Sequence, residues 1–303
     1  IFFTNRDIVK IFHACGEDIE VINNWLNVSP IPIFDTQIAA GLLNIGFSLG
    51  YRNLVNKICS IDLIKDQTRS DWLRRPLTES QCSYAVQDVL YLYRLWQLLV
   101  KSSDASNKTD WILSDGELLI KSLSRDRQND HLRISGGRKL LPRHLCALYE
   151  LSKWRENQAK KRDLPRRWIL DDKVCVRFAE ELPSNAEVLR SLIRLPSYVR
   201  EEYEEELLKI SQHCRTVPEE FLPPMMPAPL GRNMTKKVKP LKKLTLKLAE
   251  ELGTVPEILF KSKDYDLLLR LSLGEKVDIP HYWNGWRKDL VIHPLKRYLI
   301  ENC

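Results

Sequence analysis

The sequence has no Cys-x-x-Cys pair, and its seven cysteines are widely scattered over 303 residues. This pattern argues against a disulfide framework and against a zinc site, and it favours reduced, mostly buried thiols in a cytoplasmic protein. A run of about 18 apolar residues, which a membrane-spanning helix would need, is also missing. We therefore expect no membrane partner.

The first residues lack the basic start, the long apolar core and the cleavage site of a signal peptide. They also lack an initiator methionine, so we expect the chain to begin partway through a longer protein. A Gly-x-x-x-x-Gly-Lys-Ser/Thr phosphate loop is absent as well, which argues against the C-terminal arm of a helicase.

What is present is a large apolar fraction and an excess of positive charge. The chain is 44% hydrophobic, and its length suggests two or three domains, each able to bury a core. The formal net charge of +7 suggests an anionic partner, although lysine and arginine placed only for solubility would give the same total. The clustering of these charges has to decide between the two interpretations.

Short β-branched stretches alternate with amphipathic stretches in the first part of the chain. This pattern predicts strands at residues 8–14 and 31–34, and helices at residues 17–26 and from Gln37 onward. Strand, helix, strand, helix is typical of an α/β domain, which we expect to cover residues 1–125.

Helical patterns punctuated by proline follow this region. Residues 141–216 and 235–303 show such patterns, so we expect two small all-α domains of similar size. The polar residues 125–139 and the proline-rich residues 217–234 are expected to connect the parts. The chain as a whole is therefore predicted to be mostly helical.

One long helix carries the most informative pair of side chains. It is predicted to begin at a capping box formed by Thr78 and Gln81. Tyr84 and Asp88 lie one helical turn apart on one face, at the edge of an apolar stripe. A metal-dependent nuclease needs a carboxylate to hold a divalent cation and a polar group to orient the attacking water. The apolar stripe consists of Ala85, Val89, Leu92, Trp96 and Leu99.

Basic residues gather in two clusters that suit contacts with nucleic-acid phosphates. The alternative for each cluster is a solubilising face. Trp168, Trp283 and Trp286 are predicted to pack in cores or between domains and not to serve as stacking platforms for bases. The first cluster contains Lys153, Arg155, Lys160, Lys161, Arg162, Arg166 and Arg167. The second contains Arg232, Lys236, Lys237, Lys239, Lys242, Lys243 and Lys247.

Four segments together resemble the bacterial ribonuclease D family in their order and spacing. They are residues 13–20 (HACGEDIE), 35–37 (DTQ), 70–78 (SDWLRRPLT) and 84–92 (YAVQDVLYL). Residues 151–195 are similar to the helicase-and-RNase-D C-terminal (HRDC) module. The resemblance covers essentially the whole chain.

The resemblance implies an α/β ribonuclease-H-like exonuclease domain followed by two HRDC-like helical domains. It implies a metal-dependent 3′–5′ exoribonuclease that trims the 3′ ends of structured RNA such as transfer-RNA precursors. Two divalent ions, Mg²⁺ or Mn²⁺, would be held by four acidic residues, with Asp18 and Asp88 among them and Tyr84 positioning the water. RNA is therefore the expected partner of a monomeric protein.

The sequence departs from the family at the first exonuclease motif. This Asp-x-Glu, which supplies two of the acids, has no counterpart ahead of Asp18. We therefore expect a partial exonuclease domain without its first strands. The alternative is a catalytically inactive nucleic-acid-binding protein or fragment. The alternative for Asp18 is that it complements a helix dipole together with its acidic neighbours, and Asp35 is better explained as a helix N-cap than as a catalytic group.

Overall fold

The computed structural model describes residues 2–63, 70–125, 134–195, 200–225, 227–228 and 230–302. The chain divides into two compact units. The first unit combines Ile1–Ser124 with Leu230–Cys303, and the second is Arg125–Pro229. Among the described helices, none has both the length and the apolar character that crossing a membrane requires.

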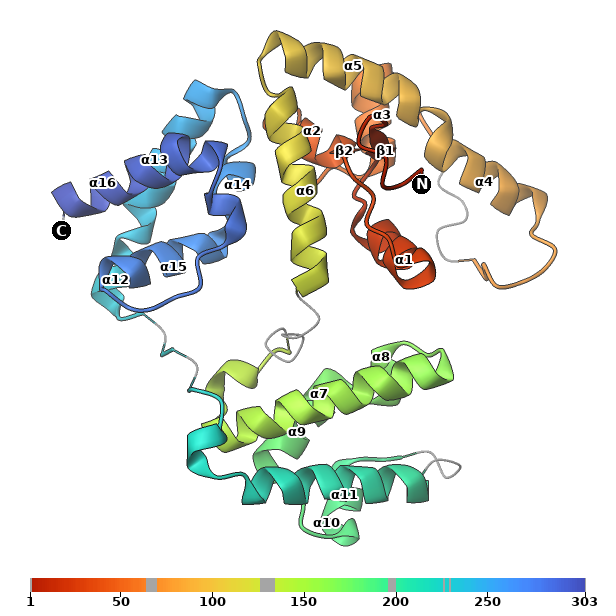
Figure 1. The fold of residues 1–303 in the computed structure, drawn as a ribbon, viewed down its shortest axis with the longest axis vertical. Helices are drawn as coiled ribbons and strands as arrows, with labels where there is room; N and C mark the ends of the chain where they lie inside the picture. Colours follow the sequence, from red (N-terminus) through yellow and green to blue (C-terminus); the bar gives the residue numbers. More distant parts are fainter. Residues whose placement is uncertain are drawn as a thin grey trace. The chain divides into compact units, whose positions relative to one another are not determined.

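The first unit begins with a small parallel β-α-β arrangement. Strand β1 (Lys10–Phe12) pairs with β2 (Ile33–Asp35) in parallel, with Lys10 opposite Ile33. Helix α1 (Gly16–Leu26) connects the strands, and α2 (Thr36–Leu42) and α3 (Tyr51–Cys59) follow, as Figure 1 shows. The predicted strands and helices of this region are thus confirmed, although both strands are shorter than expected.

The predicted long helix is in fact two helices. Helix α4 (Glu79–Leu90) begins at the expected capping box of Thr78 and Gln81, and α5 (Leu92–Ala105) starts after a break at Tyr91. The predicted apolar stripe is therefore wrong for α4, where Ala85 and Val89 are exposed, because the break turns α4 away from the core. The stripe holds for α5, whose Leu99 is buried with the neighbouring core side chains.

The remaining helices belong partly to the first unit and partly to the second. In the first unit these are α6 (Thr109–Arg125), α12 (Arg232–Lys236), α13 (Val238–Leu252), α14 (Pro256–Leu259), α15 (Ser262–Ser272), a π-helix (Lys288–Ile292) and α16 (His293–Glu301). In the second unit they are α7 (Pro142–Arg162), α8 (Arg166–Ile169), α9 (Asp172–Glu181), α10 (Ala186–Leu192) and α11 (Arg200–Thr216). Separate clusters of buried apolar residues lie in the second unit and among the C-terminal helices.

Within the first unit, the helices α12 to α16 (the C-terminal helices) pack against the part that runs from β1 to α6 (the α/β part). The ammonium group of Lys108 donates to the carbonyl oxygen of Leu42 at 2.8 Å and to that of Gly253 at 2.7 Å. The ring of Trp111 stacks on that of Trp286 with 4.3 Å between the centroids. The contacts of Lys108 with Gly253 and of Trp111 with Trp286 join residues that lie 145 or more positions apart in sequence.

Asp35 caps α2 as predicted and also holds the loop that follows β1. Its side chain is 1% exposed. Its oxygens accept hydrogen bonds from the amides of Gln37 (2.7 Å), Ile38 (3.3 Å), Ala14 (3.2 Å) and Cys15 (2.9 Å).

The substitution Asp35→Ala should lower the free energy of unfolding by roughly 2–4 kcal/mol, because a helix cap is lost and further buried amides lose their acceptor. Urea unfolding of the full chain measures this loss. Asp35→Asn, which keeps one carbonyl oxygen as acceptor, should lose clearly less. A loss from Asp35→Ala of only a few tenths of a kcal/mol would show that water replaces the carboxylate freely.

Candidate active site

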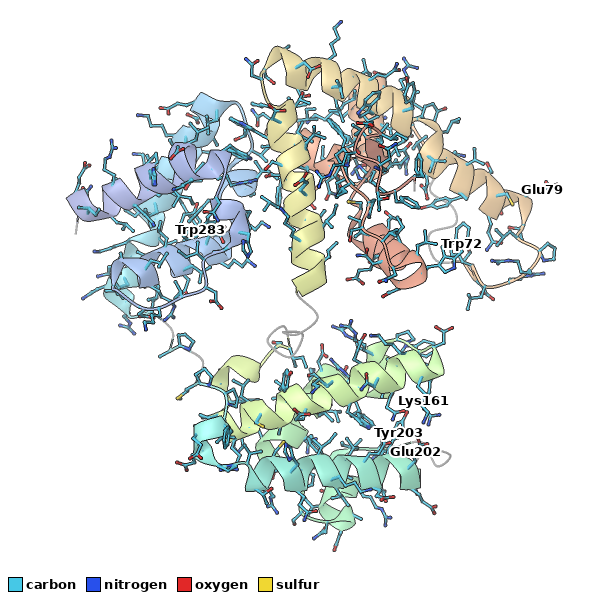
Figure 2. All side chains as sticks on the ribbon, in the orientation of Figure 1. Trp72, Glu79, Lys161, Glu202, Tyr203 and Trp283 are labelled. Atoms are coloured by element: carbon cyan, nitrogen blue, oxygen red, sulfur yellow. The ribbon has the colours of Figure 1, made fainter. Side chains whose placement is uncertain are left out.

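The start of α4 is tied to the segment that precedes it. Gln81 is buried, and its amide nitrogen donates to the hydroxyl of Ser70 at 3.1 Å and to the carbonyl oxygen of Asp71 at 2.9 Å. The ring of Trp72 then lies 5.9 Å from that of Tyr84, between centroids. In Figure 2, Trp72 lies below α4 in the view drawn. Gln81 therefore both caps α4 and places an indole beside the predicted catalytic phenol.

The end of α4 is held by a tyrosine that the sequence did not reveal. The hydroxyl of Tyr51 accepts a hydrogen bond from the amide of Tyr91 at 3.2 Å, at the break between α4 and α5. Burial raises the pKa of Tyr51 to about 12, and the nearby carboxylate of Asp88 contributes to this rise. Tyr51 thus lies close to Asp88 and fixes the helix that carries it.

The same tyrosine contacts His13 at the end of β1. Their rings meet edge to face, with 5.5 Å between centroids. The Nδ1 atom of His13 lies 2.9 Å from the hydroxyl of Thr36, which in turn donates to the carbonyl oxygen of Phe12 at 3.0 Å. Burial lowers the pKa of His13, while the charge of Asp35 acts in the opposite direction. Hydrogen bonds and one ring contact therefore link the ends of the two strands, through His13 and Tyr51, to the end of α4.

Asp18 lies in the first turn of α1, at the surface. Partial shielding from water raises its pKa, and the negative charges of Glu17 and Asp35 raise it further. Partial shielding also raises the pKa of Asp88. Both carboxylates would therefore gain from a nearby cation, since a positive charge stabilises their ionised form.

Carboxylate oxygens are the ligands that Mg²⁺ and Mn²⁺ prefer. Within the part of the chain that the structure describes, however, no group of three or more histidine, cysteine or acidic side chains is arranged to hold a metal ion. Asp18 and Asp88 have the donor chemistry for a divalent ion but do not by themselves make a complete metal site. Tyr84 is half-buried on α4, one turn before Asp88.

Arg155, one of the predicted phosphate contacts, is buried in the second unit. It is 6% exposed, and its guanidinium forms an ion pair with Asp172 at 2.7 Å and donates to the carbonyl oxygen of Leu170 at 3.0 Å. Arg155 therefore holds α7 against the turn that leads into α9. The structure contradicts its assignment as a phosphate contact, because the guanidinium is buried and paired with Asp172 inside the protein.

The other members of the first basic cluster lie on α7 and α8 beside carboxylates, and all of them are exposed except Arg162, which is half-buried over the ring of Tyr203. Glu202 pairs with Lys161 at 3.2 Å and with Arg162 at 3.0 Å, and Figure 2 shows Lys161 and Glu202 next to each other. Glu156 pairs with Lys160 at 3.3 Å and with Arg166 at 2.5 Å. Surface pairs of this kind contribute about 1 kcal/mol or less, so a phosphate could replace the carboxylate of Glu202, whose side chain is 43% exposed. Lys153 pairs with Glu150, and Arg167 with Asp172.

The three predicted packing tryptophans divide into two groups. Trp283 is buried among the C-terminal helices, and Trp286 stacks on Trp111, so both predictions are confirmed. The prediction for Trp168 is wrong, because this side chain is 74% exposed. The two residues after it, Ile169 and Leu170, take the buried positions instead.

Two parts of the chain match known protein families, and together with the fold these matches define its class. Residues 2–104 match the 3′–5′ exonuclease family, and residues 145–210 match the HRDC domain. Asp18, Tyr84 and Asp88 lie within the first match, and the whole first basic cluster lies within the second. The chain is therefore a 3′–5′ exonuclease with an HRDC domain.

Known relatives identify the family. The ribonuclease D of Pseudomonas paraeruginosa is 35% identical over 286 residues, which cover 93% of this chain and 76% of the relative. The Escherichia coli K12 ribonuclease D is 30% identical over 299 residues, which cover 97% and 80%. The crystal structure of Escherichia coli RNase D matches with a TM-score of 0.85 at 29% identity, covering 99% of this chain and 81% of that one. The chain belongs to the ribonuclease D family.

Proposed function

We propose that this exonuclease trims the 3′ ends of structured RNA, including transfer-RNA precursors, in a reaction that requires a divalent metal. The Escherichia coli relative is described as an exoribonuclease involved in structured RNA processing. The observation that carries the proposal is the turn of α4 with Tyr84 and Asp88, on a helix that Gln81 and Tyr51 hold at its two ends. Such anchoring keeps reactive groups in a fixed geometry.

Asp18 and Asp88 are proposed as ligands of Mg²⁺ or Mn²⁺, and Tyr84 as the group that orients the attacking water. A bound pair of divalent ions would stabilise the attacking and leaving oxygens of a phosphodiester. The two acids of the first family motif have no counterpart in this sequence, so Asp18 and Asp88 represent half of the expected set. Replacing Asp88 in a trimming assay tests this part of the proposal.

The domain assignment is part of the same proposal. Residues 1–125 form the C-terminal part of the exonuclease domain, residues 141–216 the first HRDC-like domain and residues 235–303 the second. Separate buried clusters in the two helical regions support this division. We propose that the protein acts as a monomer in the cytoplasm.

The surface cations of α7 and α8 are proposed to bind RNA phosphates. Replacing Lys160, Lys161 and Arg162 together by glutamine should reduce the slope of log affinity against log salt concentration by roughly 2–3, since each lost phosphate contact removes about 0.7–0.9. Fluorescence anisotropy with a hairpin RNA in EDTA measures the slope without trimming.

A matched control replaces three exposed cations of the same unit that lie outside the cluster, Lys173, Lys209 and Arg215. This triple variant should keep the parent slope. If the Lys160, Lys161 and Arg162 variant also keeps it, the cluster is only a solvated face and the proposed RNA surface is wrong.

A further inference from the structure

Trp168 is a large aromatic side chain that the second unit leaves in water. It lies on the short helix α8, with 74% of its surface exposed, between Arg167 and the buried Ile169. The side chain of Arg167 is 75% exposed and that of Arg166 is 46% exposed. An exposed indole beside two guanidinium groups offers a flat apolar face together with positive charge.

The backbone around Trp168 is held in place from within the unit. The amide of Trp168 donates to the carbonyl oxygen of Pro165 at 2.8 Å. On its other side, the buried Leu170 has its carbonyl oxygen bound by Arg155 at 3.0 Å. The turn is therefore fixed by a buried ion pair and by core packing. A ring presented on a fixed turn loses little conformational entropy when a ligand stacks on it.

The charge around the ring selects the kind of ligand. Lys160, Arg166 and Arg167 lie on the same two helices and attract a polyanion, and each also pairs with a half-buried carboxylate, that of Glu156 or of Asp172. Every nucleobase has a π-face that stacks on an aromatic side chain, and arginine adds a cation–π contribution. A base in a duplex already has stacking partners on both faces, so the ring suits an unpaired base.

We propose that Trp168 stacks on an unpaired base of the RNA substrate while Arg166 and Arg167 contact the adjoining phosphates. This inference rests on the proposed RNA-binding function and adds the part of the RNA that the second unit recognises. Trp168 would make the protein prefer structured RNA with a single-stranded segment over a fully paired RNA.

The test compares two RNAs, a hairpin with an unpaired 3′ tail and the same hairpin with a blunt end, by anisotropy in EDTA. Trp168→Ala should weaken binding of the tailed RNA by roughly 5- to 100-fold, the range expected for one stacked base. Binding of the blunt hairpin should change little. Trp168→Phe should recover most of the affinity, and the salt slope of Trp168→Ala should equal that of the parent.

Phe221 provides a matched control, because it is another 74% exposed aromatic side chain of the second unit. It lies near the N-terminal half of α7, whereas α8 follows the C-terminal end of that helix. Phe221→Ala should bind both RNAs like the parent. The stacking proposal is wrong if Trp168→Ala binds the tailed RNA as tightly as the parent, or if it weakens both RNAs equally.

The outcome also separates this inference from the proposed phosphate surface. If the Lys160, Lys161 and Arg162 variant changes the salt slope while Trp168→Ala has no effect, the phosphate surface stands and the stacking fails. If Trp168→Ala selectively weakens the tailed RNA while the salt slope of the triple variant is unchanged, the stacking stands and the phosphate contacts fail.

Discussion

Asp88→Asn should reduce the rate of Mn²⁺-dependent 3′ trimming by roughly 1,000-fold or more, while the affinity for RNA changes by less than about twofold. Asparagine keeps the size of the side chain and one oxygen, but it removes the negative charge that attracts a divalent cation. A single-turnover assay with a 5′-labelled, 3′-tailed RNA measures the rate. Anisotropy in EDTA measures the affinity.

Glu79→Gln is the matched control, because Glu79 is an exposed acid on the same helix (Figure 2) and has no proposed catalytic role. It should trim RNA at nearly the parent rate. Equal trimming by Asp88→Asn and the parent would exclude Asp88 from catalysis. A parent chain that binds RNA but never trims it would support the alternative of a catalytically inactive binding protein.

The features that could be predicted from sequence depend on residues close together in the chain. The capping box of Thr78 and Gln81 and the N-cap at Asp35 were predictable, because each depends on hydrogen bonds within three residues. The same holds for the alternation of short strands and helices. The pairing of Tyr84 with Asp88 on one face likewise follows from helical geometry alone.

The features that could not be predicted depend on long-range packing. The bond from the amide of Tyr91 to Tyr51 spans 40 residues and lies at a helix break that neither proline nor glycine marks. The contact between His13 and Tyr51 also needs β1 and α3 to meet in space. Nothing in the local pattern distinguishes these side chains from ordinary core or surface residues.

Two wrong predictions, those for Arg155 and for Trp168, had a detectable signal in the sequence. Leu148, Leu151, Arg155 and Ala159 recur every three or four residues and share the buried face of α7. The helical period therefore placed Arg155 inside, although its charge suggested the surface. Trp168, Ile169 and Leu170 belong to one helical turn, and such a turn can bury only one of its faces. The two aliphatic side chains occupy the buried face, so the indole stays in water.

The buried ion pair between α6 and the C-terminal helices leads to the second large effect. Arg287 is 4% exposed and Asp115 is 7% exposed. The two groups form a bidentate pair with distances of 2.5 and 2.6 Å, and Arg287 also donates to the carbonyl oxygen of Ile258 at 2.9 Å. The indole of Trp286 donates to the same carboxylate at 3.3 Å. Asp115 thus satisfies donors from the C-terminal helices.

Arg287→Met should lower the free energy of unfolding of the first unit by about 3–5 kcal/mol, because Asp115 would remain buried without its partner. Urea unfolding of the full chain, followed by tryptophan fluorescence, measures the change. The double variant Asp115→Leu with Arg287→Met should recover much of the loss, since two apolar side chains leave no unpaired charge.

The matched control is Arg52→Met, which breaks an ion pair with Asp62 of similar length, 2.7 Å, at the surface of the same unit. It should cost less than about 1 kcal/mol, because water solvates both exposed partners. If Arg287→Met costs no more than Arg52→Met, water reaches Asp115 and the pair is not what joins the C-terminal helices to α6. A large loss that the double variant reverses would instead show that the unpaired carboxylate of Asp115 causes the fall in the free energy of unfolding. It would also show that the C-terminal helices and the α/β part unfold together.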